Sequence, residues 1–431
     1  MLRVQRTFPI NDSGALKAQL LEWAQAFEEI VYLDSNSYSA QHPFEAILAV
    51  EAFTALKTDY KNAFEQLDEY QKTTKDWIFG YLSYDLKNDT EKITSTNHDG
   101  LAFPDLYFFQ PQRLIFLKKD EICFDYLNLV GEEIEEDFLA IKNCSVASYA
   151  SAEAKEYTVT SKICKEKYLE KVEQFLTHLK RGDIYEANFC QEFYVENVQI
   201  DPKKTFQNLN LLSKAPFAAF LKLEEFFLLS GSPERYLKKE GEKIISQPIK
   251  GTAARSKNPA KDQALKEALP NDPKERAENI MIVDLVRNDL SKTAAKGSVK
   301  VEELCEVYSF KTVHQLISTI SSSVKENIAP VEIIKSTFPM GSMTGAPKLS
   351  AMQIIEELEE SKRGLYSGAV GYFTPNGDFD FNVVIRSVLY NKEKKYCSFS
   401  VGGAITAKSI PEKEYEECTL KAAAMHKALK M

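Results

Sequence analysis

The sequence predicts a large mixed α/β or α+β fold built around an extensive core. Its 431 residues are 44% hydrophobic and 27% charged, a balance that is typical of globular proteins and excludes general disorder. Helical and strand-like segments alternate along the chain, which favours a mixed core. Glycine is unevenly spread, since 4 of the 17 glycines lie before position 150 and 13 lie after it. Because glycine permits close backbone approach, we expect the functional site in the C-terminal two-thirds.

The composition excludes several classes of protein. A formal net charge of −9 argues against non-specific binding to nucleic acid. The seven cysteines are scattered and include no CxxC pair, so neither a disulfide framework nor a zinc cluster is indicated. No hydrophobic signal core follows the first residues, and no apolar run is long enough to cross a bilayer. We therefore expect a cytoplasmic protein with no membrane partner.

The first part of the chain is predicted to form an N-terminal region, residues 1–150, that shares one core with a catalytic region, residues 151–431. Residues 14–30 are typical of a helix, and residues 76–82 and 113–117 of strands. Small residues then dominate Ser145–Ala154, which is the best candidate for a linker. An amphipathic helix is predicted over residues 161–181, because apolar side chains recur there at helical spacing.

Lys250 stands at the end of a stiff apolar segment, where it is followed by glycine. Pro248 fixes its own φ, Ile249 is β-branched, and Gly251 allows close approach, so the lysine side chain is given a defined direction. If a pocket removes water from its ammonium group, the pKa of Lys250 falls and the amine becomes a nucleophile. A solvated surface lysine is the alternative when this segment is taken alone.

A helix is predicted from the Asn271-Asp272-Pro273 cap to about Leu290. Glu275 and Glu278 share one face of it. Acidic residues also favour a helix N-terminus through the macrodipole, which leaves an alternative explanation open.

A second helix is predicted from Ser409, whose hydroxyl is expected to form a capping box with Glu412. Glu414, Glu417 and Lys421 follow one another at helical spacing on it. Glutamates from the two helices would repel each other unless a cation lay between them, and Mg²⁺ is the cation that prefers carboxylate oxygens. A solvated acidic face is the alternative.

The glycine-rich segment Phe338–Lys348 is not a phosphate loop of the Walker type, because its glycine spacing is wrong and Pro347 removes one backbone donor. It leads into a helix predicted over residues 349–360. Its free N–H groups are able to bind a carboxylate, and a tight loop between core elements is the equal alternative.

Buried strands are predicted over residues 364–373 and 381–388, joined by a turn at residues 375–377. Arg386 lies within the second apolar run and requires an anion, either a ligand carboxylate or an acidic residue of the protein. A further strand at residues 400–405 presents the bare backbone of Gly402 and Gly403 beside the helix that carries Glu417.

Taken together, these segments resemble the chorismate-utilising enzymes from about residue 160 to 425. The resemblance also reaches Asp76–Asp85 and Tyr32–Asn36 in the N-terminal region. The motifs that carry it are Gly182–Asn188, Ser230–Glu234, Pro248–Thr252, Glu275–Asp289, Gly341–Lys348, Arg363–Gly368, Arg386, Gly402-Gly403 and Glu414–Lys421. The resemblance implies an α+β fold, with a large two-layered β-sandwich core wrapped by helices and an active site in its cleft.

The residue before the Gly-Thr pair separates two chemistries in that family. Relatives that form anthranilate typically have alanine there, whereas relatives that form 4-amino-4-deoxychorismate have lysine, as this chain does at Lys250. The resemblance thus implies that Lys250 attacks C2 of chorismate, that Glu234 protonates the departing C4 hydroxyl, and that ammonia then replaces lysine. Formation of anthranilate is the nearest alternative, and a catalytically silent amino-acid-binding regulator is a remote one.

The resemblance also assigns the remaining site residues. Glu278 and Glu417 match magnesium ligands, and Glu275 and Glu414 would bind the ion through water. The residues that match the substrate-binding set are Thr252, Tyr366, Arg386, Gly402, Gly403 and Lys421.

Two departures from the family patterns bear on the chemistry. Glu186 replaces the lysine base of relatives that add water to chorismate, so hydroxylation is disfavoured, and Glu186 either orients ammonium or lines the pocket. Gln315, beside His314, replaces a histidine of relatives that make an aromatic product, which favours a non-aromatic product that a separate lyase would convert.

The source of ammonia is also implied. The chain has no Gly-x-Cys-x-Gly motif for glutamine hydrolysis, so a separate glutamine amidotransferase is expected to supply ammonia. The Tyr32–Asn36 segment resembles a tryptophan-binding stretch but departs from its usual pattern at Asp34 and Asn36, and a structural strand is expected there.

Overall fold

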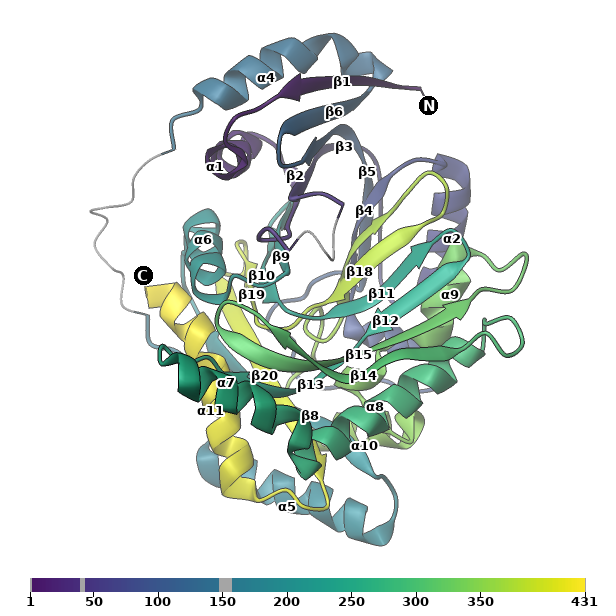
Figure 1. The fold of residues 1–431 in the computed structure, drawn as a ribbon, viewed down its shortest axis with the longest axis vertical. Helices are drawn as coiled ribbons and strands as arrows, with labels where there is room; N and C mark the ends of the chain where they lie inside the picture. Colours follow the sequence, from purple (N-terminus) through teal and green to yellow (C-terminus); the bar gives the residue numbers. More distant parts are fainter. Residues whose placement is uncertain (1, 39–42, 147–156, 431) are drawn as a thin grey trace.

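Two layers of antiparallel strands diverge from one long central pair, β3 (Ala46–Thr58) and β5 (Leu106–Leu117), in the computed structural model (Figure 1). The structure describes residues 2–38, 43–146 and 157–430. β5 pairs with β3 along its whole length, with β6 along its second part and with β4 at its start. One strand therefore belongs to both layers and joins them.

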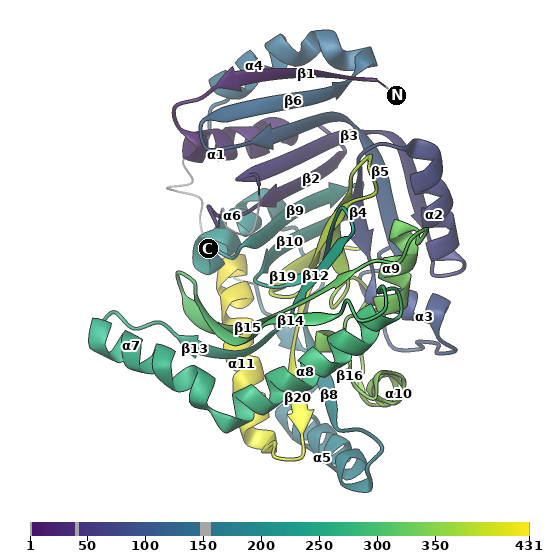
Figure 2. The same ribbon diagram turned by 45° about the vertical axis from the view of Figure 1, so that its right-hand side comes forward.

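The first layer continues from β5 through β3 to the C-terminal part of the chain, and Figure 2 shows its middle strands β2, β9, β10 and β19 side by side. In spatial order its strands are β1 (Arg3–Pro9), β6 (Glu121–Leu127), β5, β3, β2 (Glu29–Asp34), β9 (Phe217–Leu223), β10 (Phe226–Ser232), β19 (Ser387–Asn391), β20 (Tyr396–Thr406) and β8 (Glu186–Val195). Two short strands, β7 (Thr160–Ser161) and β16 (Gly345–Ala346), also pair with β8.

The second layer begins where β4 pairs with β5. Its strands in spatial order are β4 (Ile78–Leu82), β17 (Ala369–Phe373), β18 (Phe379–Val383), β11 (Arg235–Glu240), β12 (Lys243–Gln247) and β15 (Val313–Ser323). β13 (Ile249–Ala254) continues the line of β12 along β15, and β14 (Lys300–Ser309) pairs with β15 as well.

The core consists of two apolar clusters separated by the first layer. Along β2, Val31 faces the cluster between the layers, while Ile30 and Tyr32 face the cluster beneath the outer helices. Alternate residues of a strand point to opposite faces, so a strand covered on both sides is apolar throughout. This double burial explains why these segments show no alternation of polar and apolar residues in the sequence.

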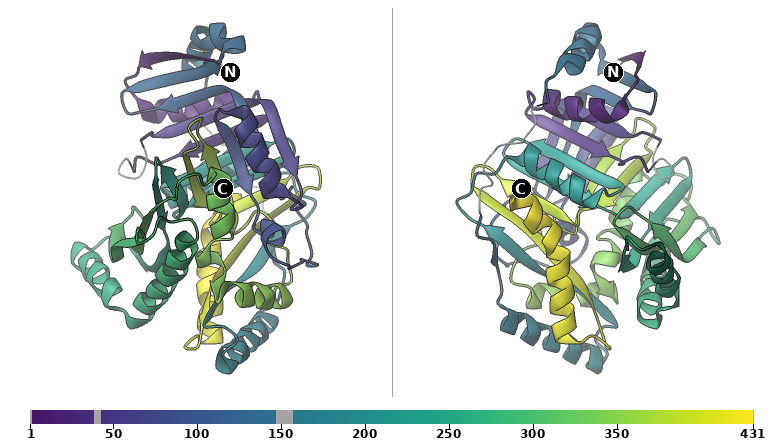
Figure 3. Two further views of the ribbon diagram at one scale, coloured as in Figure 1. Left: turned by 90° about the vertical axis from the view of Figure 1, so that its right-hand side faces the viewer. Right: turned by 60° about the vertical axis from the view of Figure 1, so that its left-hand side comes forward.

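Helices cover the outer face of the first layer and one end of the second. Figure 3 shows α11 (Pro411–Lys430) running along the strands of the C-terminal part. The helices that bury side chains in the outer cluster are α1 (Ser13–Ala24), α4 (Ile134–Asn143), α5 (Lys165–Arg181), α6 (Pro202–Ser213), α10 (Lys348–Leu358) and α11. Those that contribute to the inner cluster are α2 (Ala63–Thr74), α8 (Pro273–Ser291) and α9 (Pro330–Thr337).

The remaining helical segments are short or exposed. They are α3 (Lys87–Thr90), α7 (Pro259–Ala268) and the 3₁₀ turns η1 (Tyr84–Leu86), η2 (Asn128–Glu133), η3 (Leu269–Asn271) and η4 (Gly341–Met343). In the described part of the chain, no helix combines the length and the apolar character that a membrane crossing requires. The α+β sandwich wrapped by helices that the sequence resemblance implied is confirmed.

Several predicted boundaries were wrong for identifiable reasons. The first helix ends at Ala24, because Glu29 and Ile30 already pair with β9 as part of β2. The helix predicted from residue 161 begins at Lys165, since Ser161 pairs with Phe193 in β7. The linker predicted at Ser145–Ala154 lies outside the described residues from position 147 onward.

Two further corrections concern the C-terminal part. Residues 364–368 form a turn and not a strand, with Gly364 and Ser367 at positive φ (55° and 63°). The capping box predicted at Ser409 is wrong, because its hydroxyl accepts a hydrogen bond from the Thr406 amide and the helix begins two residues later, at Pro411.

Candidate active site

Two short links between the layers each carry a predicted site residue. Glu234 lies in the short link between β10 of the first layer and β11 of the second. Arg386 lies in the link between β18 and β19, which a single strand was wrongly predicted to span. The amide of Val383 donates to the Glu234 carbonyl (3.0 Å), and the amide of Gly231 donates to the Arg386 carbonyl (3.1 Å). The two crossings are thus tied together beneath the site.

A cavity of about 510 Å³ opens at these crossings. Its walls come from β8, β13, β20, α8, α11 and the two crossing segments. Twelve of the thirteen predicted site residues line it: Glu234, Lys250, Thr252, Glu275, Glu278, Tyr366, Arg386, Gly402, Gly403, Glu414, Glu417 and Lys421. The thirteenth, Glu186, lies behind Lys250. Residues that are up to 187 positions apart in the sequence therefore form one cavity, of a size that suits a small-molecule ligand.

Lys250 reaches the cavity from a bulge in β13. Its side chain is 13% exposed, and its Nζ lies 3.3 Å from Oε1 of Glu186, which is itself buried. Burial acts to lower the pKa of Lys250, but the nearby carboxylates of Glu186, Glu278 and Glu234 outweigh it and raise that pKa. The neutral amine that the sequence predicted is therefore not the resting form, and Lys250 must lose a proton before it acts as a nucleophile.

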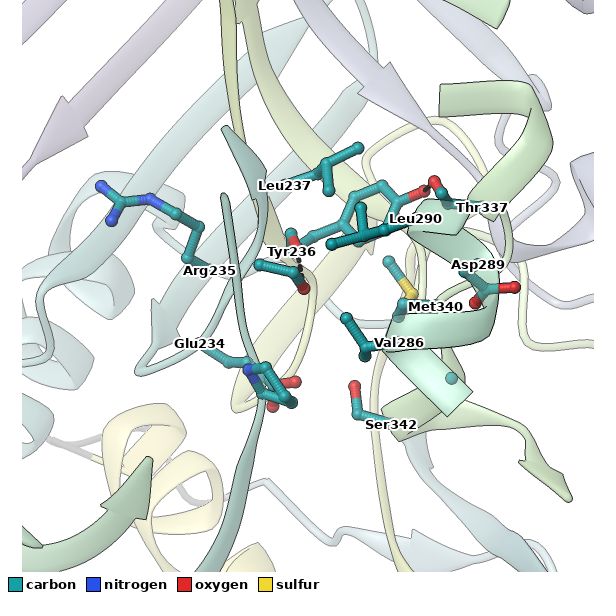
Figure 4. A pocket seen from close by; sticks show the side chains of 13 residues that line it. Glu234, Arg235, Tyr236, Leu237, Val286, Asp289, Leu290, Thr337, Met340 and Ser342 are labelled. Carbon is teal, nitrogen blue, oxygen red and sulfur yellow. Dashed lines mark hydrogen bonds between the residues drawn. The ribbon is translucent and has the colours of Figure 1, made fainter. Parts of the chain in front are cut away.

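Glu234 is enclosed beside the same strand, where its carboxyl lies close to the backbone of Ile249. Burial raises the pKa of its carboxyl to about 7, while the Ser342 hydroxyl and the Lys250 ammonium oppose that rise. Figure 4 shows the Glu234 carboxyl and the Ser342 hydroxyl facing each other beside a small pocket of about 20 Å³. Val286, Leu290 and Met340 line that pocket too. An apolar surrounding of this kind keeps a carboxylic acid protonated near neutral pH, as a general acid requires.

Four glutamates gather at the other end of the cavity, two from α8 and two from α11. Asp272 caps α8 through bonds to the amides of Lys274 and Glu275, so the helix start is fixed as predicted. Burial raises the pKa of Glu278 to about 7, and Oε1 of this side chain has no hydrogen-bond partner among the residues that the structure describes. The pKa of Glu417 is lowered. Burial acts to raise it, but the Lys421 ammonium, 2.6 Å away, outweighs the effect of burial.

A lysine that the sequence reasoning missed lies among these acids. Lys274 Nζ is 3.6 Å from Glu414 and 3.8 Å from Glu278, and it feels the charges of Glu417 and Glu275 as well. Its position one helical turn before Glu278 is the signal that would have revealed it. Within the described ranges, no group of three or more His, Cys, Asp or Glu side chains is arranged to hold a metal ion. The carboxylate oxygens of these glutamates nevertheless form a donor set that suits a hard cation.

Arg386 supplies positive charge on the wall next to Tyr366. Burial lowers the pKa of its guanidinium. Among the residues that the structure describes, no carboxylate lies within ion-pair distance of Arg386, so the interpretation as a structural salt bridge is wrong and a ligand anion is favoured. Its backbone is held in the left-handed region (φ 52°) where the chain turns between layers. Tyr366 is buried beside it, and its hydroxyl accepts a bond from the Cys190 thiol (3.6 Å).

Gly402 and Gly403 lie on β20, opposite Cys190 and Phe189 of β8. A Cβ on Gly402 would come within 2.3 Å of the Phe189 carbonyl, so the strand pairing admits no side chain there. A Cβ on Gly403 would stand 3.6 to 3.8 Å from Glu414, Lys421 and Glu417, in the space where these groups converge. Lys421 also donates to the Gly402 carbonyl (2.9 Å). Bare backbone therefore keeps this wall open for a ligand.

The glycine-rich loop forms a tight connection. Lys348 donates to Asp289 (2.5 Å) and to the carbonyls of Thr337 (3.0 Å) and Pro339 (2.9 Å). These three bonds occupy the Lys348 ammonium group, so this side chain does not bind a ligand. Gly345 pairs with Ala187 of β8. The loop nevertheless reaches the cavity through Ser342 and Met343. Ser342, and Asn188 on β8, also line the cavity, although neither was predicted individually as a site residue.

Residues near Tyr32 form a strand, as predicted. Asp34 accepts from Lys17 (2.7 Å), and Asn36 bonds to Asn210 (2.7 Å). The cavity beside Asp34 measures about 40 Å³.

Gln315 lines the main cavity. His314 is buried behind it and is hydrogen-bonded to Ser309.

Comparisons with known proteins show the family to which the chain belongs. The model of a family described as chorismate binding enzyme matches residues 22–427. A probable chloroplastic aminodeoxychorismate synthase of Oryza sativa subsp. japonica is 36% identical over 387 residues, which cover 81% of this chain and 43% of that protein. Aminodeoxychorismate synthase component 1 of Escherichia coli (strain K12) is 34% identical over 342 residues, 78% of this chain and 73% of the relative. The chain thus spans less than half the length of the plant relative.

A solved structure shares the architecture. Anthranilate synthase component I from Streptococcus pneumoniae TIGR4 superposes with a TM-score of 0.77 at 25% identity, and the match covers 88% of this chain and 91% of that one. The two-layered core is therefore that of a known fold.

Proposed function

Because the chain belongs to the chorismate binding enzyme family, we propose that it is the ammonia-using component of an aminodeoxychorismate synthase, which converts chorismate and ammonia to 4-amino-4-deoxychorismate. The observation that carries this proposal is the pairing of Lys250 with Glu234 on the walls of one cavity. A lysine nucleophile and a protonated carboxylic acid are the two groups that displacement of a poor leaving group requires. The names of the plant and E. coli relatives support the same activity.

The first step breaks the bond from C4 to its hydroxyl. Lys250 gives up a proton, for which the Glu186 carboxylate 3.3 Å away is well placed, and its amine attacks C2 of chorismate. The two conjugated double bonds of the ring shift toward C4 as the hydroxyl departs, and Glu234 donates the proton that turns it into water. The product of this step is an adduct with a new bond between Lys250 and C2.

The second step reverses the shift. Ammonia attacks C4, the two double bonds return to their original places, and the bond to Lys250 breaks, so that the lysine is regenerated as an amine. Two successive displacements preserve the configuration at C4. Arg386, without a protein carboxylate within ion-pair distance in the described ranges, is the natural partner of a substrate carboxylate, with Tyr366, Thr252, Gly402, Gly403 and Lys421 around it.

We also propose that Glu278 and Glu417 hold Mg²⁺, with Glu275 and Glu414 bound through its waters. When bound, the ion would neutralise a ring carboxylate that these glutamates otherwise repel. The support is the acidic cluster itself, whose charge is balanced in this structure by Lys274 and Lys421.

Replacement of Glu278 by glutamine is expected to weaken Mg²⁺ binding by about tenfold or more, because a neutral amide oxygen replaces a buried carboxylate. Isothermal titration with Mg²⁺ in the absence of chorismate measures this directly. Glu357→Gln, an exposed site on α10, is the matched control and should bind like the wild type. An unchanged affinity in Glu278→Gln would exclude this residue as a ligand.

The proposal implies two partner proteins. The E. coli relative is named a component 1, which supports a second component, and a glutamine amidotransferase is the chemistry that would supply ammonia. A separate lyase would remove pyruvate from the non-aromatic product to give para-aminobenzoate, a precursor of folate. A cytoplasmic location stays a prediction from the sequence.

The function is tested by incubating the purified protein with chorismate, Mg²⁺ and an ammonium salt, with and without an aminodeoxychorismate lyase. We expect 4-amino-4-deoxychorismate alone, and para-aminobenzoate only when the lyase is present. Fluorescent anthranilate formed without the lyase would identify the alternative activity. Tryptophan binding without any turnover of chorismate would indicate the silent regulator, and either result would overturn the proposal.

A further inference from the structure

The strand that carries Lys250 is interrupted at the lysine itself. In the pairing of β13 with β15, Ile249 lies opposite Ile317 and Thr252 lies opposite Gln315, so Lys250 and Gly251 together face the single residue Leu316. This is a β-bulge, in which one extra residue breaks the regular ladder and redirects a side chain. The regular pairing of β13 with β15 is therefore interrupted where the carbonyls of Lys250 and Leu316 lie.

Both of these carbonyls accept hydrogen bonds from one side chain on α8. Nδ2 of Asn279 lies 3.2 Å from the Lys250 carbonyl oxygen and 3.3 Å from the Leu316 carbonyl oxygen. Asn279 is 1% exposed, so water is unable to replace these bonds. A primary amide carries two N–H groups, and the two carbonyls use both of them.

The orientation of the Asn279 amide is fixed from its other side. Oδ1 accepts from the Ser318 hydroxyl (2.5 Å) and from the Cys305 thiol (3.5 Å). The same Ser318 oxygen accepts from the Cys305 amide (2.9 Å). A flipped amide would set its oxygen against two carbonyl oxygens, so this network admits one orientation. Asn279 thereby links α8 to β13, β14 and β15 at one buried point.

The bulge has little freedom to adjust by itself. Gly251 has a φ of 97°, and a Cβ there would come within 2.9 Å of Leu316 and 3.2 Å of Glu275. Asn279 directly follows Glu278, whose side chain lines the cavity on the same turn of helix. The direction in which Lys250 leaves its strand is therefore set relative to the acidic end of the cavity.

We propose that Asn279 is a positioning residue for Lys250, which holds the bulge in the one geometry that aims the amine across the cavity. Asn279 touches the backbone of Lys250 and lines no part of the cavity. Its effect is on the attacking step and not on the binding of substrate. The inference rests on the proposed function as far as the covalent step is concerned, whereas the tie between α8 and the bulge is independent of it.

The variant Asn279→Asp keeps the shape of the side chain but turns a carboxylate oxygen toward the two carbonyls. Asn279→Ala removes the tie altogether, and Asn288→Asp, on the exposed side of the same helix, is the matched control. Rates are normalised to the folded fraction measured by near-ultraviolet circular dichroism. We expect kcat to fall about 10- to 100-fold in Asn279→Asp, with the KM for chorismate changed less than about threefold. The adduct on Lys250, followed by intact mass without ammonia, should form more slowly by the same factor.

Hydrogen exchange of the 248–254 segment provides the readout that does not depend on activity. We expect faster exchange in both Asn279 variants and wild-type exchange in Asn288→Asp. A normal kcat in folded Asn279→Asp, or unchanged exchange in both variants, would overturn the inference. Absence of 4-amino-4-deoxychorismate with the wild-type protein would instead overturn the proposed function, and hydrogen exchange would still decide whether Asn279 holds the bulge.

Discussion

Replacement of Lys250 by alanine is expected to lower the turnover of chorismate by about 10³-fold or more, the scale of loss when a covalent nucleophile is removed. Without the amine, ammonia would have to displace the C4 hydroxyl directly, and Glu234 alone does little for that reaction. The fold should persist, because the side chain lies at the cavity wall and is bonded mainly to Glu186. Product formation is measured by chromatography, and the adduct on the wild-type enzyme by intact mass.

The matched control for this experiment is Lys257→Ala, an exposed lysine just beyond the end of β13. It removes the same side chain from the same region and should leave turnover unchanged. Normal formation of 4-amino-4-deoxychorismate by Lys250→Ala would exclude covalent catalysis by this residue. A switch to anthranilate in that variant would show instead that Lys250 selects the product without being essential for turnover.

The sequence predicted the two helices that carry the glutamates well, because the features that define them depend on neighbouring residues. The Asp272-Pro273 pair sets the start of α8, and helical spacing places Glu275 and Glu278 on one face wherever the helix packs. The same spacing joins Glu414, Glu417 and Lys421 on α11. These features depend on residues within two turns of one another, and tertiary contacts did not override them.

Local sequence patterns did not predict where the chain crosses from one layer to the other. The run that contains Arg386 is apolar and β-branched, which favours one continuous strand, yet the chain leaves the second layer after Val383 and enters the first at Ser387. Propensity is alike on both sides of the crossing, so nothing in the local sequence marks it. The raised pKa of Lys250 was missed for a related reason, since Glu186 approaches it from a strand 64 positions away.

Replacement of Glu234 by glutamine is expected to lower kcat by about 10²- to 10⁴-fold, because the amide has no proton to donate to the departing hydroxyl. Glutamine keeps the size of the side chain, so chorismate should still bind. Glu240→Gln, at an exposed position on β11, is the control and should retain full turnover. Equal kcat in Glu234→Gln and the wild type would exclude Glu234 as the general acid.

The pH dependence of kcat is a second, independent test of Glu234 as the general acid. Burial raises the pKa of its carboxyl to about 7 in the folded protein, against roughly 4.3 for an unperturbed glutamate. The acid form is therefore present below pH 7, and wild-type kcat should fall as the pH rises through that value. The residual turnover of Glu234→Gln should lack this limb, which a pH profile of kcat measures.

The same pKa difference predicts how stability changes with pH. As the pH rises above about 4.3, Glu234 loses its proton in the unfolded chain but keeps it in the folded one, so the free energy of unfolding falls until about pH 7. The loss amounts to about 3 kcal/mol between pH 4 and pH 8. Glu234→Gln lacks this contribution, so its stability relative to the wild type should increase over that range in urea titrations. A constant difference between the two proteins would mean that Glu234 is ionised in the folded state, and a carboxylate that is already ionised is unable to protonate the C4 hydroxyl.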